Sequence, residues 1–215
     1  MDKDRAPSST IIPLVRELPA DTETPVSVYL KLRGLGPSFL LESVEGGEHL
    51  ARYSMIGTQP RAILRSWGRR VVVEQEGTWR ETQLEQGDVL DVLRDLMPRY
   101  PAGLALDLPR FTGGAVGYLG YDLVHSFETL RTTPRPPGTL PDAALLLCDR
   151  LAIVDHVRNR LLLIAHAALD DRPSHREAES ALDEMVARLR RPLPETPPPA
   201  ASLTATQHTF RSAFG

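Results

Sequence analysis

The sequence of 215 residues contains one cysteine, Cys148, and only two lysines, Lys3 and Lys31. A single cysteine excludes an internal disulfide, and its place in the apolar run 143–148 predicts a buried structural thiol. No apolar run approaches the ~20 residues needed to cross a bilayer. The charged segment 1–10 also lacks the apolar core of a signal peptide. These absences predict a cytoplasmic protein with no membrane partner.

An excess of positive charge is missing as well. The formal net charge is -3 at pH 7, whereas proteins that bind nucleic acids show a clustered basic surface. Nucleic acid is therefore not an expected partner. Hydrophobic residues make up 41% of the chain and charged residues 25%, which is typical of soluble globular proteins. A chain of this length can bury a sizeable core without disulfides or metals.

The motifs that carry common enzyme chemistry are absent too. There is no G-x-S-x-G elbow, no P-loop and no H-E-x-x-H sequence. The six histidines lack metal-ligand spacing, and paired carboxylates such as Asp170 and Asp171 lie in solvated contexts. We therefore expect no catalytic residue, no metal site and no cofactor in these residues.

Hydrophobic periodicity and turn residues predict a fold of short strands with a few helices. Strands are expected at residues 38–44, 52–56, 61–67, 70–75, 77–79, 111–121, 142–148, 151–155 and 161–165, with an antiparallel meander over residues 61–79. Helices are expected after the N-cap Thr24, after Asp88, after the cap Asp122 and after a capping box at Ser174–Glu177.

A proline-rich segment marks a domain boundary. Residues 192–203 cannot form a helix or a central strand and are predicted to be an extended linker after a domain of residues 1–191. Residues 204–215 begin with a second capping-box pattern, and their apolar stripe stops with the chain after barely three turns. Because so short a helix is marginal in water, we interpret it as the start of a truncated second domain.

The glycine-rich run at residues 111–122 has the spacing G-x-x-G-x-x-G, which differs from the G-x-G-x-x-G of dinucleotide sites. Glycines in a strand commonly allow another backbone or a bulky side chain to approach closely. We favour this interpretation over a phosphate site at a helix N-terminus.

Two neighbouring strands combine hydroxyls, a cation and apolar side chains, the mixture that an amino-acid ligand requires. The residues are Leu41, Glu42, Ser43, Arg52, Tyr53 and Ser54. Strand alternation places Leu41 and Ser43 on one face and Glu42 on the other, which favours Ser43 as the ligand contact. From these residues alone, a structural explanation is favoured over a ligand site. In it, Ser43 is buried and hydrogen-bonded to a neighbouring backbone group, and Arg52 is exposed.

Two long motifs stand out, residues 39–57 (FLLESVEGGE, then ARYSMIG) and residues 111–122 (FTGGAVGYLGYD). They resemble the N-terminal region of anthranilate synthase component I, with weaker similarity at residues 24–27 and 147–151. The resemblance spans about residues 10 to 210 and implies an α+β fold of packed, mainly antiparallel sheets with helices outside. It also implies that the region carries part of a feedback site for L-tryptophan, contacted by Ser43, with Leu41 and Glu42 beside it and Arg52, Tyr53 and Ser54 as further candidates.

The resemblance implies partners as well. In that family, component I converts chorismate to anthranilate and pyruvate with ammonia from a glutamine amidotransferase subunit. Chorismate and Mg²⁺ are held by a C-terminal chorismate-binding domain, which would begin near Thr204 and lie beyond the present sequence, so residues 1–215 alone are predicted to be inactive. The alternatives are the N-terminal part of aminodeoxychorismate synthase component I and a standalone amino-acid-binding module.

Overall fold

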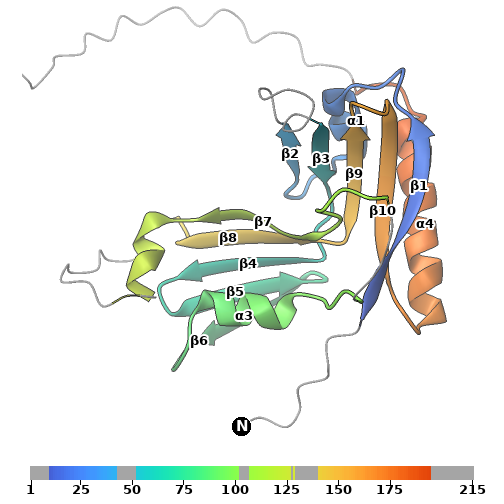
Figure 1. The fold of residues 1–215 in the computed structure, drawn as a ribbon. Coiled ribbons are helices and arrows are strands. Elements are labelled where there is room, and N and C mark those ends of the chain that lie inside the picture. Colours follow the sequence, from blue (N-terminus) through green and yellow to red (C-terminus); the bar gives the residue numbers. More distant parts are fainter. Residues whose placement is uncertain (1–9, 43–51, 102–106, 127, 129–139, 195–215) are drawn as a thin grey trace, which may run out of the picture.

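The computed structural model describes residues 10–42, 52–101, 107–126, 128 and 140–194. Within these residues, two five-stranded antiparallel sheets carry three α-helices on their outer faces (Figure 1). The strands of the two sheets run crosswise to each other. The predicted α+β class with mainly antiparallel sheets and helices outside is confirmed.

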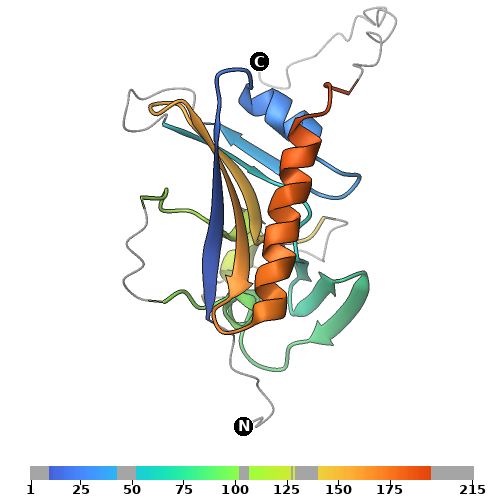
Figure 2. The ribbon, with the colours of Figure 1, turned by 90° about the vertical axis from the view of Figure 1, so that its right-hand side faces the viewer.

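In the part of the chain that the structure describes, the α-helices of the first sheet lie on one face. Its strand order is β1 (Ile11–Pro19), β10 (Arg160–Ala168), β9 (Arg150–Asp155), β3 (Tyr53–Gly57) and β2 (Phe39–Glu42). Helices α1 (Pro25–Leu32) and α4 (Arg172–Leu189) cover what we call the helix face, and α4 runs along it in Figure 2. The opposite, far face buries a second apolar cluster that includes Ile153 and Ile164. The central strands are therefore apolar on both sides.

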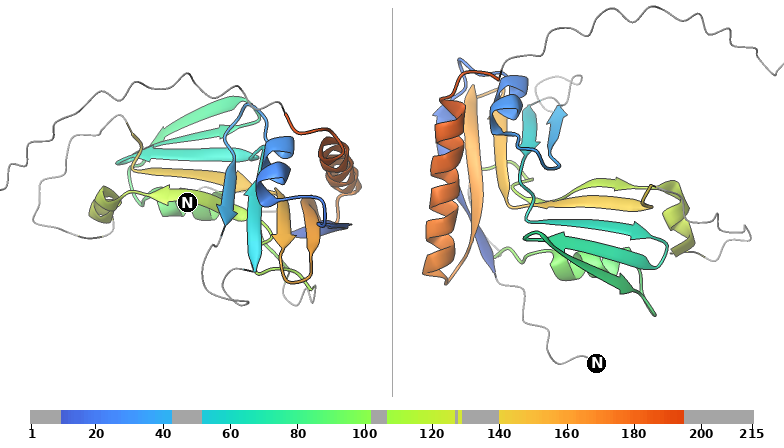
Figure 3. Two further views of the ribbon diagram at one scale, coloured as in Figure 1. Left: turned by 90° about the horizontal axis from the view of Figure 1, so that it is seen from above. Right: turned by 180° about the vertical axis from the view of Figure 1, so that it is seen from behind.

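The second sheet is covered less completely. Its strand order is β6 (Thr78–Gln83), β5 (Arg70–Gln75), β4 (Ala62–Trp67), β8 (Ala143–Cys148) and β7 (Gly114–Leu119). The short helix α3 (Val89–Leu96) packs on one face, as the view from behind in Figure 3 shows. The predicted meander of β4, β5 and β6 is confirmed.

The chain passes between the sheets at two places. Only Asp149 separates β8 in the second sheet from β9 in the first, and a short turn joins β3 to β4. Strands that switch sheets make the corners of crosswise packings. The two sheets are therefore connected through the β3–β4 and β8–β9 links.

The helix starts follow from side-chain caps. Thr24 accepts a hydrogen bond from the Ser27 backbone N–H at 3.1 Å, and Asp88 accepts one from Leu90 at 2.7 Å, so both predicted N-caps are confirmed. Their side chains satisfy backbone N–H groups that the first helical turn leaves without partners.

The predicted start of α4 is wrong. The helix begins at Arg172 with Asp171 as its N-cap, and the Asp171 carboxylate accepts a hydrogen bond from the Ser174 N–H. The Ser174 hydroxyl instead accepts one from the Ala168 N–H at 2.9 Å. The aspartate competes successfully because it lies before Pro173, a residue suited to a first turn. The predicted apolar stripe of α4 is confirmed by its buried residues, Ala178, Ala181, Leu182, Met185 and Leu189.

Strand β1 was not predicted, because Pro13 interrupts its apolar run. Proline lacks a backbone N–H and is tolerated on an edge strand, and β1 is an edge of the first sheet. Within the described residues, no helix has the length and apolar character that a membrane crossing requires.

Candidate functional site

Strands β2 and β3 bring the predicted ligand residues together. They pair antiparallel, with Leu41 opposite Met55 and Glu42 opposite Ser54. The predicted contact between the two strands is therefore confirmed. Ser43, the favoured residue, lies outside the described residues, immediately after the end of β2.

Alternation divides these residues between the two faces of the sheet. Leu41 and Tyr53 lie on the far face, and Glu42 and Ser54 on the helix face. Ser54 is 2% exposed, and its hydroxyl shares a 2.8 Å hydrogen bond with Nε2 of His156. Ser54 is thus occupied inside the protein, whereas Leu41 is exposed at the edge of the far face.

Arg52 is held by a buried carboxylate, contrary to the simple expectation of an exposed arginine. Its Nε donates to Oδ1 of Asp155 at 2.9 Å and its Nη2 donates to Oδ2 at 2.8 Å. Such bidentate pairs fix both distance and orientation. The Arg52 backbone carbonyl also accepts from the His156 N–H at 2.9 Å, so the start of β3 is fixed to the end of β9.

Asp155 is the residue that sequence reasoning missed. Its side chain is fully buried, and it also accepts hydrogen bonds from Nε of Arg160 and from the Arg158 N–H, both at 3.3 Å. The hydrogen bonds from Arg52 are the main reason that the pKa of Asp155 falls from 3.8 to about 2, and the pKa of Arg52 is correspondingly raised. The sequence feature that could have revealed Asp155 is an aspartate at the end of an otherwise apolar strand. Its partner Arg52, however, lies 103 residues away in the chain.

The charged cluster extends beyond this pair. Arg160 donates from Nη1 to Glu17 of β1 at 2.8 Å and from Nη2 to the Asp107 carbonyl at 3.4 Å. The Asp107 carboxylate pairs with Arg158, and this hydrogen bond is the main cause of its lowered pKa. The cluster therefore joins β1, the turn between β9 and β10, and the segment at Asp107.

Tyr53 lies beneath the Arg52 guanidinium, whose central carbon is 4.8 Å from the ring centroid. This is a cation–π contact. With Nε and Nη2 bound to Asp155, Nη1 is the end of the guanidinium without a partner among the described residues. The arrangement offers one oriented cationic donor next to the apolar far face, which is chemically suited to a carboxylate on an apolar ligand.

The glycine-rich run is explained by close packing. A Cβ on Gly117 would overlap the Ala144 carbonyl, and one on Gly120 would lie 2.9 Å from the Asp142 carbonyl oxygen. The interpretation as a strand with close backbone approach is confirmed. The predicted cap is wrong, because Asp122 lies within a 3₁₀-helix, η1 (Tyr121–Ser126). Most of the predicted continuation to residue 130 is outside the described residues.

Cys148 is buried, as predicted, and burial is the main cause that raises the pKa of its thiol to about 12. Burial likewise lowers the pKa of His166. Among the residues that the structure describes, no group of three His, Cys, Asp or Glu side chains could hold a metal ion.

Comparison with known proteins places the chain in a family. The family model for chorismate binding enzymes matches residues 36–214. The chain belongs to the chorismate-binding enzyme family. The match runs through the predicted linker at residues 192–203, so the proposed domain boundaries remain predictions. Residues 195–215 lie outside the part that the structure describes.

Several curated relatives of this family member are named anthranilate synthase component 1. The protein of Pseudomonas aeruginosa is 37% identical over 208 residues, which cover 94% of this chain and 42% of the relative. That of Neisseria gonorrhoeae is 40% identical (83% and 37% covered), and that of Acetivibrio thermocellus 36% identical (76% and 33% covered). The chain thus spans about a third to two-fifths of the length of these relatives.

A solved structure is similar in fold. Anthranilate synthase component I from Streptococcus pneumoniae TIGR4 superimposes with a TM-score of 0.51 at 24% identity, over 82% of this chain and 37% of that one. This similarity concerns the fold.

Proposed function

We propose that this chain is the N-terminal portion of an anthranilate synthase component I and that its first sheet carries part of an L-tryptophan feedback site. The names of the relatives at 36–40% identity support this assignment over aminodeoxychorismate synthase component I and over a standalone module. The complete protein would convert chorismate to anthranilate and pyruvate, with ammonia from a glutamine amidotransferase subunit. Chorismate and Mg²⁺ would be held by residues of the C-terminal half, and none of the catalytic residues by this chain.

The Arg52–Asp155 pair is the observation that carries the proposal. It fixes the start of β3 beside the end of β2, and it leaves Nη1 of Arg52 directed away from Asp155 on the same face as Leu41 and Tyr53. By alternation Ser43 would share that face. The carboxylate of tryptophan would accept from Arg52 or Ser43, and burial of the indole against the apolar far face would supply much of the affinity.

Glu42 and Ser54 would act indirectly. Both lie on the helix face, where Ser54 is buried against His156. We therefore assign Ser54 a supporting role in positioning β3. Inhibition would be a population shift, in which tryptophan stabilises an arrangement of the two halves that binds chorismate poorly.

The test is a chimera in which residues 1–191 replace the aligned part of the Pseudomonas aeruginosa relative. We expect anthranilate formation from chorismate and glutamine that L-tryptophan inhibits. Ser43→Ala should raise the tryptophan concentration for half-inhibition about tenfold, the value of a hydrogen bond to a charged group, with kcat unchanged. Ser180→Ala, on the exposed side of α4, is the matched control and should leave inhibition unchanged.

Two results would contradict the proposal. An active chimera that tryptophan does not inhibit would show that residues 1–191 carry no part of the feedback site. For residues 1–215 alone we expect weak or absent tryptophan binding by calorimetry and no anthranilate formation. Turnover by these residues alone would show that catalytic groups lie within them.

A further inference from the structure

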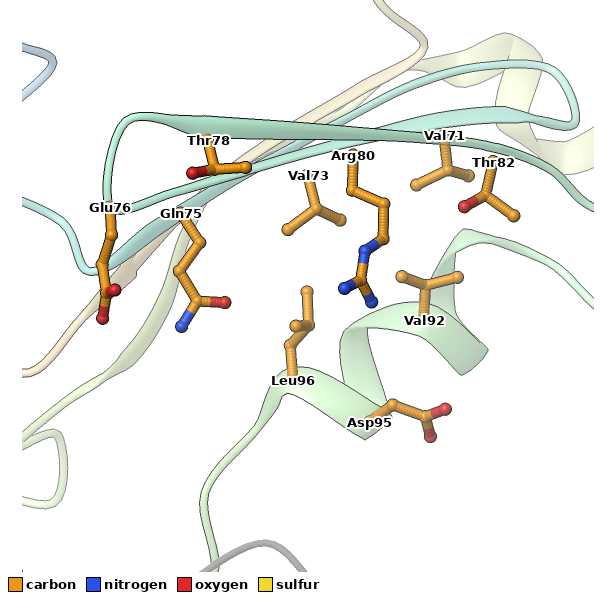
Figure 4. A pocket seen from close by; sticks show the side chains of 10 residues that line it. All are labelled: Val71, Val73, Gln75, Glu76, Thr78, Arg80, Thr82, Val92, Asp95 and Leu96. Carbon is orange, nitrogen blue, oxygen red and sulfur yellow. The ribbon is translucent and has the colours of Figure 1, made fainter. Parts of the chain in front are cut away.

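A groove opens on the second sheet, between α3 and the hairpin of β5 and β6 (Figure 4). Its volume is about 450 Å³. Small-molecule sites commonly occupy roughly 300–1,000 Å³ and combine an apolar lining with a few polar groups. The groove lies in the other sheet from the tryptophan patch proposed above, so it is a separate site.

The groove exists because α3 is too short to cover the whole sheet. The helix has eight residues, and its apolar side chains pack with β4 and β8. Val92 and Leu96 form one wall of the groove. Strand pairing places Val71 and Val73 of β5 on the face toward α3, and these valines form the apolar floor. An apolar body seated here would remove the exposed parts of these side chains from water.

Arg80 supplies the polar group. It is the one basic residue among the described residues that line the groove, and Figure 4 shows its side chain reaching from β6 toward α3. Its side chain makes no hydrogen bond or ion pair with any residue that the structure describes. By contrast, Arg65 and Arg70 on the opposite face of the sheet pair with Glu74 at 3.3 Å and Glu81 at 2.7 Å.

The residues around Arg80 favour one kind of anion. Thr78 and Thr82 lie two positions on either side of Arg80 and share its face, so a hydroxyl flanks the guanidinium in each direction along β6. A guanidinium fork matches the two oxygens of a carboxylate. Glu76 lines the groove at one end in Figure 4 and would repel a second negative group.

We propose that this groove binds a small monocarboxylic acid with an apolar body. The carboxylate accepts hydrogen bonds from the Arg80 guanidinium, which Thr78 and Thr82 flank along β6. The body lies on Val73, Val92 and Leu96. Because Arg80 is exposed, binding weakens as salt concentration rises.

The experiment is an NMR titration of the full 215-residue chain with 4-phenylbutyrate, observed at labelled valine and leucine methyls. We expect saturable shifts at the methyls of Val73, Val92 and Leu96 with a Kd of about 1 mM or tighter, the range for a ligand of this size. The neutral analogue 4-phenylbutyramide should bind about tenfold more weakly.

Variants separate the role of Arg80 from a general effect on the fold. Arg80→Gln should weaken 4-phenylbutyrate binding about tenfold, and Arg80→Lys, which keeps the charge without the fork, by an intermediate factor. Arg70→Gln, on the opposite face, is the matched control and should leave the Kd unchanged. Equal binding of acid and amide, an unaffected Arg80→Gln variant, or no saturable shifts in the wild-type chain would each overturn the proposal.

Discussion

The two sheets use the same kind of ion pair in opposite surroundings. In the first sheet the central strands β9 and β10 are buried on both faces, and the Arg52–Asp155 pair ends in a carboxylate with no exposed surface. In the second sheet every residue of β6 is exposed, and the side chains of the Arg70–Glu81 pair are 48% and 56% exposed. Both pairs are bidentate, so burial is what distinguishes them.

This difference in burial indicates that the ion pair contributes more to stability in the first sheet than in the second. A buried charge that loses its partner is costly because water cannot replace the partner, whereas exposed pairs exchange with water at little cost. The first sheet is therefore a rigid platform next to the proposed tryptophan patch. The second sheet keeps a partly covered face on which a groove can remain open.

The largest effect is expected from Asp155→Ala. The change removes the carboxylate that pairs with Arg52 and accepts from the Arg158 N–H, and it removes one of the acceptors of Arg160. It should lower the free energy of unfolding by about 3 kcal/mol, as for a broken buried ion pair. Urea denaturation followed by circular dichroism measures this. A midpoint equal to that of wild type would show that the cluster is no more important than a surface pair.

Acid should remove part of the same stabilisation. The pKa of Asp155 is lowered on folding, from 3.8 to about 2, so its contribution is complete above pH 3.8 and is lost as pH falls through about 2. The contribution is at most about 2 kcal/mol, and less where solvent screens the partly exposed Arg52. Unfolding free energies between pH 6 and pH 2 should therefore fall more steeply for wild type than for Asp155→Ala. Parallel curves would contradict the assignment.

The smallest effect is expected from Glu81→Gln in the second sheet. Its partner Arg70 also stacks on Trp67, with 5.1 Å between the guanidinium carbon and the ring centroid, and both members of the pair are accessible to water. The urea midpoint should stay within experimental error of wild type. A loss comparable to that of Asp155→Ala would remove the contrast between the two sheets.

Local sequence signals predicted much of the fold. The caps Thr24 and Asp88, the apolar stripe of α4 and most strands were readable because each depends on residues a few positions apart. The errors have local causes too. Pro13 concealed β1, and two competing caps, Asp171 and Ser174, displaced the start of α4 by a few residues.

Only part of the candidate site could be predicted from the sequence. The pairing of β2 with β3 and the alternation of their faces followed from the pattern, and the similarity to known sequences directed attention to these strands. Asp155 and Arg80 were missed for the same reason. A carboxylate that organises three donors, or a guanidinium left without a partner, is defined by neighbours that come from distant parts of the chain.

By itself, then, the sequence determined the α+β class, the family and the two strands that carry the proposed tryptophan patch, because periodicity, capping and motif order are properties of contiguous residues. The tertiary structure alone decided that the strands divide between two crosswise sheets, that Arg52 is fixed by Asp155, and that α3 leaves a groove beside Arg80. These features depend on burial and on contacts across the chain, and the cost of desolvating a charge is set only once the surrounding elements have packed.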